Sequence, residues 1–168
     1  TISGGPHGLH PLGAAWVDAH GDAAEDGGAG KCRACHGNDY KGTVLSRTVA
    51  TRTFSTEFGK RNFFAGAQIS CFACHNGPSS ESSTTNHAPK ATDRTLSTRP
   101  DTPQSIDLTA TDADGNALVF RIVSQPAHGT VGLSGKRATY YPESKYQGAD
   151  SFTFAAWDGK IDSNLATA

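Results

Sequence analysis

Two short motifs of identical spacing constrain this chain more than any other feature. They are Cys32-Arg33-Ala34-Cys35-His36 and Cys71-Phe72-Ala73-Cys74-His75, and they contain all four cysteines of the 168 residues. The C-x-x-C-H spacing is the attachment signature of c-type haem. Two thiols three positions apart on one tight turn can each add across a haem vinyl group, and the adjacent histidine supplies an axial nitrogen to the iron. We therefore predict two covalent haems, bound by Cys32, Cys35 and His36 and by Cys71, Cys74 and His75.

The same four cysteines allow two other interpretations. Two C-x-x-C pairs could form a four-thiolate zinc site, or they could form disulfides or a redox-active dithiol. Neither interpretation requires a histidine directly after both second cysteines. Haem also explains how a chain with 19 glycines and 36% hydrophobic residues can fold, because each porphyrin would replace apolar core that the composition lacks.

The second axial ligand decides between an electron carrier and a catalyst. The chain has no methionine, which excludes His/Met ligation, and three further histidines precede the first motif. We expect His10 and His20 to be the distal iron ligands, with His7 as the alternative. Iron held by two histidines has no open coordination position, so this supply of histidines favours electron transfer and argues against an enzyme.

Charge and hydropathy exclude other classes of partner. Lysine and arginine number 15 against 16 aspartate and glutamate, a net charge of −1, which argues against binding nucleic acid through a basic face. No apolar run reaches the roughly 18 residues of a membrane-spanning helix. No basic stretch followed by an apolar segment opens the chain, so we expect a secretory signal to have been removed. The expected location is the cell surface, the extracellular space or the periplasm.

Composition changes near residue 85 and divides the chain into two predicted domains, 1–85 and 86–168. The first is mostly irregular and organised by haem, with a short helix over Gly13–His20 and a hairpin between Arg47–Phe54 and Asn62–Ser70. Its aromatic side chains are expected to pack on the porphyrins: Tyr40, Phe54, Phe63, Phe64 and Phe72.

The second domain has strand signals at regular intervals. Short alternating runs separated by Gly, Pro and Asp turns, with no helix between them, indicate an antiparallel β-sandwich. The predicted strands are Ser105–Thr111, Ala117–Val123, Gly129–Leu133, Ala138–Tyr141 and Asp150–Trp157.

One turn of this domain carries oxygen-bearing side chains at alternate positions. Asp112, Asp114 and Asn116 resemble part of a calcium loop, but Val123 stands where an EF-hand needs a glutamate. A tight hairpin turn explains the same residues, and a calcium ion bridging the two domains is the alternative.

Both halves resemble known families. The C-x-x-C-H motifs, with Gly8-Leu9-His10-Pro11-Leu12-Gly13, Trp16 and His20, resemble secreted multihaem c-type cytochromes. This resemblance also implies His10 and His20 as distal ligands. Residues 86–168 are similar to bacterial cadherin-like or Ig-like repeats, which implies adhesion, spacing or assembly. The motifs that carry this second resemblance are Leu108-Thr109-Ala110-Thr111-Asp112-Ala113-Asp114-Gly115, Gln125-Pro126-Ala127-His128-Gly129-Thr130, Tyr140-Tyr141-Pro142 and Tyr146-Gln147-Gly148-Ala149-Asp150-Ser151-Phe152.

Such repeats close with a longer final strand than Asn164-Leu165-Ala166-Thr167-Ala168. A shortened strand leaves a sheet edge unpaired, so we expect assembly into an oligomer or filament through that edge. The sequence as a whole predicts an extracytoplasmic dihaem electron carrier that exchanges electrons with redox partner proteins or extracellular acceptors. The alternatives are a haem peroxidase or small-molecule reductase with an open axial site, and an adhesion module in which haem is a structural staple.

Overall fold

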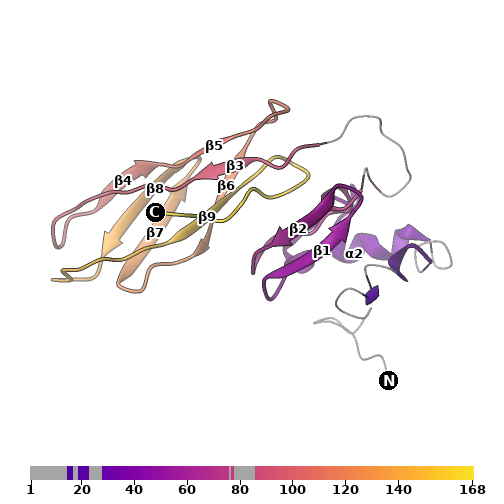
Figure 1. Ribbon diagram of the computed structural model, residues 1–168. Helices are drawn as coiled ribbons and strands as arrows, with labels where there is room; N and C mark the ends of the chain where they lie inside the picture. The colour runs from indigo at the N-terminus through magenta and orange to yellow at the C-terminus, as the bar shows by residue number, and fades with distance from the viewer. Residues whose placement is uncertain (1–14, 17–18, 23–27, 76, 78–85) are drawn as a thin grey trace, which may run out of the picture.

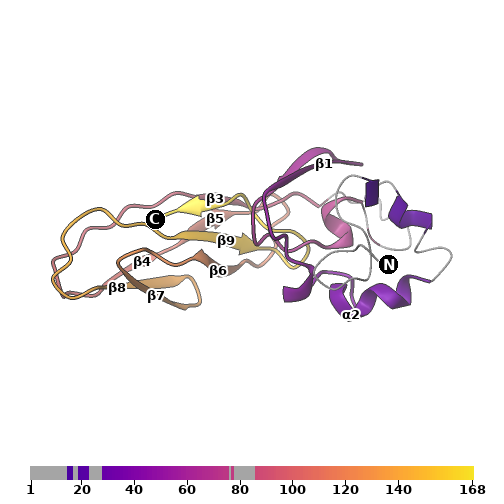
Figure 2. The same ribbon diagram turned by 90° about the horizontal axis from the view of Figure 1, so that it is seen from below.

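The computed structural model describes residues 15–16, 19–22, 28–75, 77 and 86–168. Most regular structure in these residues is β-strand, with a few short helices near the N-terminus (Figure 1). A strand-rich sandwich forms the C-terminal half, and the cysteine-containing region lies at one end of it (Figures 1 and 2). Among the described residues, no helix has both the length and the apolar character needed to cross a bilayer.

The N-terminal region is built from single helical turns and one hairpin. The turns are η1 (Ala29–Cys32), α2 (Arg33–His36), η2 (Val44–Ser46) and η3 (Cys71–Ala73). The hairpin pairs β1 (Arg52–Thr56) with β2 (Gly59–Phe63), and an isolated bridge from Arg47 to Gln68 extends it. The predicted hairpin is therefore confirmed. Of the predicted helix Gly13–His20, residues 15–16 and 19–20 are helical, and the others lie outside the described residues.

The C-terminal half contains eight strands; four of the five strand predictions are confirmed, and the fifth corresponds to two separate strands. The eight strands are β3 (Lys90–Thr92), β4 (Gln104–Asp107), β5 (Thr109–Thr111), β6 (Val119–Ser124), β7 (Gly129–Ser134), β8 (Arg137–Pro142), β9 (Thr153–Trp157) and β10 (Ala166–Thr167). They pair antiparallel in the orders β4-β8-β7, β10-β9-β6 and β3-β5. The predicted strand Ser105–Thr111 is interrupted at Leu108, so that β4 joins β8 while β5 joins β3.

A hydrophobic core lies between the sheets of this sandwich. Phe154 of β9 is fully buried, and Leu108 is 1% exposed at the point where β4 gives way to β5. Strands of both sheets contribute because alternate side chains of each strand point inward. The buried members are Ala91, Leu108, Val131, Ala138, Phe152, Phe154 and Ala166.

The final strand corrects one expectation. β10 pairs with β9, and Phe152 and Ala168 exchange backbone hydrogen bonds of 2.9 and 3.0 Å. On the other side of β10, the Arg94 N–H donates to the Thr167 carbonyl at 2.9 Å, and the Thr167 N–H donates to Asp93 Oδ1 at 2.8 Å. β10 is the edge strand of the β10-β9-β6 sheet, and at Thr167 its outer side has one backbone partner, Arg94, and one side-chain partner, Asp93. The expected edge is therefore not unpaired at Thr167, because the Asp93–Arg94 segment covers it there.

A second core joins the two halves and corrects the expected role of two aromatic residues. Phe63 and Phe64 are 5% and 8% exposed, and they pack with Ala155 of β9 and Ile161 of the sandwich. We expected them on porphyrin faces. They are instead buried in the junction, because the hairpin and the segment after it rest on the end of the sandwich (Figure 2).

Candidate functional site

Each C-x-x-C-H motif folds as a single helical turn. In the first, η1 leads into α2, and the Gly37 N–H donates to the Arg33 carbonyl at 2.9 Å. In the second, η3 begins at Cys71, whose carbonyl accepts from the N–H groups of Cys74 at 3.2 Å and His75 at 3.1 Å. Residues three apart share one side of a helical turn, so each pair of thiols faces the same way. This is the local geometry that two-point attachment to one planar group requires.

The environment of the thiols favours neutral sulfur. All four cysteines are free of disulfides. Burial, with smaller contributions from the nearby Cys32 and Cys74, raises the pKa of the Cys71 thiol to about 11. Burial also raises the pKa of Cys74. Both thiols of the second pair are therefore neutral at pH 7.

The four sulfurs do not converge on one centre. In the part of the chain that the structure describes, no group of three or more His, Cys, Asp and Glu side chains is arranged to hold a metal ion. A four-thiolate zinc site needs all four sulfurs around one point. The arrangement of the described cysteines does not provide this.

The structure brings one predicted distal histidine to a predicted proximal one. The imidazole rings of His20 and His75 have centroids 5.9 Å apart and planes inclined by 24°. Two imidazoles that each bind one metal ion through a nitrogen at about 2 Å have ring centres roughly 6 Å apart. The centroid separation of His20 and His75 is thus close to that of two axial ligands of one iron ion.

The other predicted proximal histidine contacts a backbone carbonyl. His36 Nδ1 lies 3.3 Å from the carbonyl oxygen of Ile69. Because a carbonyl can only accept, this contact is a hydrogen bond in the tautomer that has its proton on Nδ1. Two exposed apolar side chains follow this motif in the sequence, Val44 and Leu45, which are 67% and 50% exposed. A porphyrin bound at His36 would find apolar surface there to cover. The two candidates for the opposite face, His7 and His10, lie outside the described residues.

Backbone bonds join the two motifs. The Cys71 N–H donates to the Tyr40 carbonyl at 3.1 Å, and the Ile69 N–H donates to the Ser46 carbonyl at 3.2 Å. Gly42 lies against this contact with φ +88°, and a Cβ there would come within 2.6 Å of the Ile69 oxygen. The segment before the second motif is therefore packed tightly against the loop after the first.

Arg61 is a further basic residue at the second motif. Its Nη1 donates to the Ala73 carbonyl at 2.9 Å, and its guanidinium lies 4.7 Å from the centre of the Phe58 ring. Burial lowers the pKa of Arg61, although Cys74 and Asp158 act in the opposite direction. A cation held at this place would face acidic groups of a cofactor bound at Cys74.

Sequence reasoning missed the residues of the sandwich that reach the motifs. Asp162 and Arg121 form an ion pair, and Asp162 accepts the Gln68 N–H at 2.8 Å. The side chain of Asp162 is 3% exposed. No sequence pattern marks a contact between residues 94 positions apart, and the Ile69 carbonyl is a backbone group that carries no residue signal. Asp162 lies between Ile161 and Ser163, and this local sequence carries no signal of a buried structural aspartate.

The calcium candidate is a hydrogen-bonded turn in the structure. Asp112 Oδ1 accepts from the backbone N–H groups of Asp114 at 3.0 Å and Asn116 at 2.9 Å. Both oxygens of Asp114 contact His87, one at its backbone N–H and one at Nδ1. These hydrogen bonds lower the pKa of Asp114. Protein donors thus occupy Asp112 Oδ1 and both oxygens of Asp114, as in the hairpin-turn interpretation, whereas Asp112 Oδ2 is buried without a hydrogen-bond partner among the described residues.

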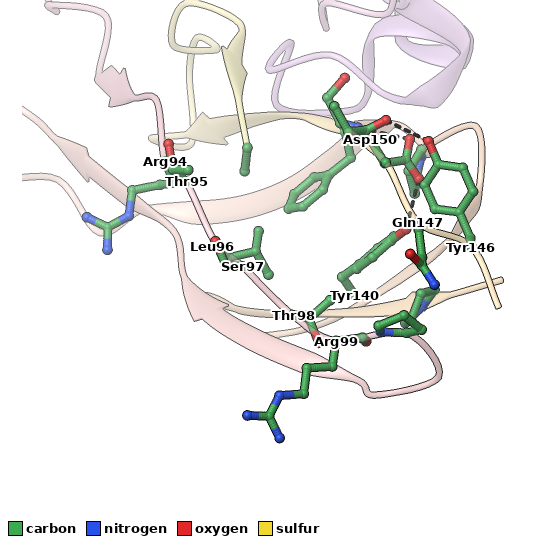
Figure 3. A pocket seen from close by; sticks show the side chains of 18 residues that line it. Arg94, Thr95, Leu96, Ser97, Thr98, Arg99, Tyr140, Tyr146, Gln147 and Asp150 are labelled. Atoms are coloured by element: carbon green, nitrogen blue, oxygen red, sulfur yellow. Dashed lines mark hydrogen bonds between the residues drawn. The ribbon is translucent and has the colours of Figure 1, made fainter. Parts of the chain in front are cut away.

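A groove in the sandwich is separate from the cysteine motifs. It encloses about 660 Å³ between residues 94–100 and the loop that contains Tyr146 and Asp150 (Figure 3). None of its lining residues belongs to a C-x-x-C-H motif. Its carboxylate, Asp150, accepts from the Tyr140 hydroxyl at 3.0 Å and from three backbone N–H groups. This carboxylate already has structural partners, so the groove is not the candidate site.

One half of the chain matches a known protein family. Residues 86–168 match the family model of the bacterial Ig domain. With the paired sheets and the buried core described above, this match identifies the C-terminal half as an Ig-like β-sandwich. Neither the curated proteins nor the solved structures gave a match.

Proposed function

We propose that this protein is an extracytoplasmic electron carrier with two covalent c-type haems. One haem is bound by Cys32, Cys35 and His36, and the other by Cys71, Cys74 and His75. The observation that carries the proposal is that the His20 and His75 rings lie 5.9 Å apart, close to the separation of two axial ligands of one iron ion. When bound, each haem would supply one-electron ferric and ferrous chemistry.

The residues of the chain have distinct tasks in this proposal. Each cysteine would add its sulfur to one carbon of a vinyl group and its hydrogen to the other, so no oxidant or reductant would be consumed. His75 and His20 would hold the second iron. His36 would hold the first iron together with His10, or with His7 as the alternative. Ligands that stay in place in both oxidation states keep reorganisation small, which suits electron transfer.

Closed coordination also separates this proposal from an enzyme. A peroxidase or reductase needs an iron position that a small molecule can reach, and two histidines per iron leave none. The absence of methionine from the sequence removes the usual alternative ligand. The bacterial Ig-like half supports a location outside the cytoplasm, where it would hold the haem region at a surface or beside a redox partner.

Removal of one cysteine pair tests the proposal. Purified wild-type protein is expected to exceed the 17.5 kDa of the bare polypeptide by the mass of two haems, and its reduced form should show the absorption bands of haem c. The double variant Cys71→Ser/Cys74→Ser should retain one haem, and Cys32→Ser/Cys35→Ser should retain the other. A wild-type protein with the bare mass and no visible absorption contradicts the proposal.

A further inference from the structure

The segment that precedes the second motif, residues 68–71, is held from two sides. On one side are the carbonyls of the loop after the first motif, including a 3.1 Å bond from Gln68 Nε2 to the Gly42 oxygen. On the other side is the 158–163 loop of the Ig-like half, which connects β9 and β10. The Ser70 hydroxyl donates to the Lys160 carbonyl of this loop, and the Lys160 ammonium lies 5.8 Å from the centre of the Phe72 ring.

The 158–163 loop is itself fixed before it reaches the cysteine region. Asp158 is 8% exposed, and its Oδ1 accepts the N–H groups of Lys160 and Ile161, each at 2.7 Å. Its Oδ2 accepts from Asn86 Nδ2 at 2.8 Å. Ile161 is buried in the junction core with Phe63 and Phe64. A loop held in this way presents Asp162 at a defined position.

Asp162 connects the Ig-like half to the first proximal histidine. It accepts the Gln68 N–H at 2.8 Å and pairs with Arg121 of β6. The next residue, Ile69, offers its carbonyl to His36 Nδ1 at 3.3 Å. The position of that carbonyl depends on where Gln68 is anchored, because one peptide separates the two groups. Asp162 is therefore linked to His36 through the hydrogen bond to Gln68 and the hydrogen bond from His36 to Ile69.

We propose that Asp162 is a positioning residue that sets the orientation and the donor strength of His36 at the first haem. This inference rests on the proposed function. A hydrogen bond from Nδ1 to a carbonyl makes imidazole a stronger electron donor to ferric iron and lowers the reduction potential. The Ig-like half then does more than display the haems, because it takes part in tuning one of them.

The test compares Asp162→Ala with Asp162→Asn. Alanine removes the acceptor of the Gln68 N–H, whereas asparagine keeps an oxygen there and removes only the charge. We expect Asp162→Ala to shift the reduction equilibrium of one haem about tenfold toward the reduced form. For one electron this corresponds to a rise of about 59 mV in its reduction potential. Asp162→Asn should move it by less than a third of that value. The electron paramagnetic resonance g values of the same ferric haem should change only in the alanine variant.

Assignment and controls use residues elsewhere in the chain. The affected haem should be the one at His36. It can be identified because His20→Ala should change only the potential of the other haem, for which His20 is proposed as a ligand. Asp107→Ala removes an exposed carboxylate that pairs with Lys136 and Arg137, and both potentials should stay as in wild type. If Asp162→Ala gives no folded protein, Asp162→Glu replaces it. Glutamate keeps the charge, displaces the oxygens by one methylene group, and should shift the same haem.

The outcomes separate this inference from the proposed function. Three results would overturn the inference and leave the proposed function standing: equal potentials in wild type and Asp162→Ala, equal shifts in the alanine and asparagine variants, or equal shifts of both haems. An Asp162→Glu variant with wild-type potentials would also overturn the inference alone. A wild-type protein that contains no haem overturns the proposed function, and the inference with it.

Discussion

The two halves of this protein are stabilised in different ways. The sandwich has a core made entirely from its own residues, from Ala91 to Ala166, with Phe154 fully buried. The cysteine region consists of one-turn helices and a single hairpin, and its core is completed by Ala155 and Ile161 of the sandwich. One half is therefore organised by the alternation of its strands. The other depends on its neighbour and, in our proposal, on the groups that its cysteines bind.

The largest expected effect is carbon monoxide binding at only one of the two proposed irons. In His20→Ala, the second iron loses its distal ligand, so the reduced protein should bind about one carbon monoxide molecule per chain, measured by its absorption change. Wild-type protein should bind none, because in our proposal both irons would have two protein ligands. His128→Ala is the matched control, since His128 stacks on Tyr146 within the sandwich. Carbon monoxide binding by the wild type would favour an open-site enzyme.

A core substitution in the sandwich should cost the most stability. Phe154→Ala removes a fully buried ring and should lower the free energy of unfolding by about 3–5 kcal/mol in urea titrations. Val119→Ala, at a side chain that is 64% exposed, should change it by less than about 0.5 kcal/mol. Similar small effects in both variants would mean that this core does not hold the sandwich together.

A smaller substitution tests the shared core. Ile161→Val should cost about 0.5–1.5 kcal/mol, because the junction loses one buried methylene group. The same urea titration should show no comparable loss for Val49→Ala, whose side chain is 70% exposed in the cysteine region. An unchanged stability in Ile161→Val would show that the two halves do not depend on each other for packing.

The smallest effect is a dependence on pH. Burial raises the pKa of Asp162 above its ordinary value of 3.8, with Arg121 acting in the opposite direction. The folded protein therefore binds a proton more readily at this residue than the unfolded chain does. As the pH rises from about 3.8 through the folded pKa, this residue's contribution to stability should decrease. Urea titrations of wild type and Asp162→Asn over this range check the sign, and a difference that grows in favour of wild type with rising pH contradicts it.

The sandwich could be predicted from the sequence because strands and turns are marked by residues that are close together in the chain. Phe152 and Phe154 alternate into the core at the start of β9, although Ala155 and Ala156 are buried as well, and Gly and Asp turns separate the strands. β3 and β10 escaped prediction because they are two or three residues long, too short for alternation to show. The break at Leu108 was also missed, since the change of partner strand depends on tertiary pairing.

The candidate site was predicted only in part, for a different physical reason. The motif cysteines and histidines have a fixed spacing, and His20 stands out as one of few histidines near them. The contacts of Asp162 with Gln68 and of His36 with Ile69 depend on how the two halves pack, and they use backbone atoms. The junction role of Phe63 and Phe64 was misjudged because a buried aromatic ring has the same sequence signal against a porphyrin or a sheet.

A redox titration followed by absorbance tests the central claim most directly. The account predicts that each chain takes up two electrons in reversible one-electron steps, with low-spin spectra throughout and no change on adding carbon monoxide. A colourless protein, or one that takes up no electrons over the range of biological potentials, would contradict it.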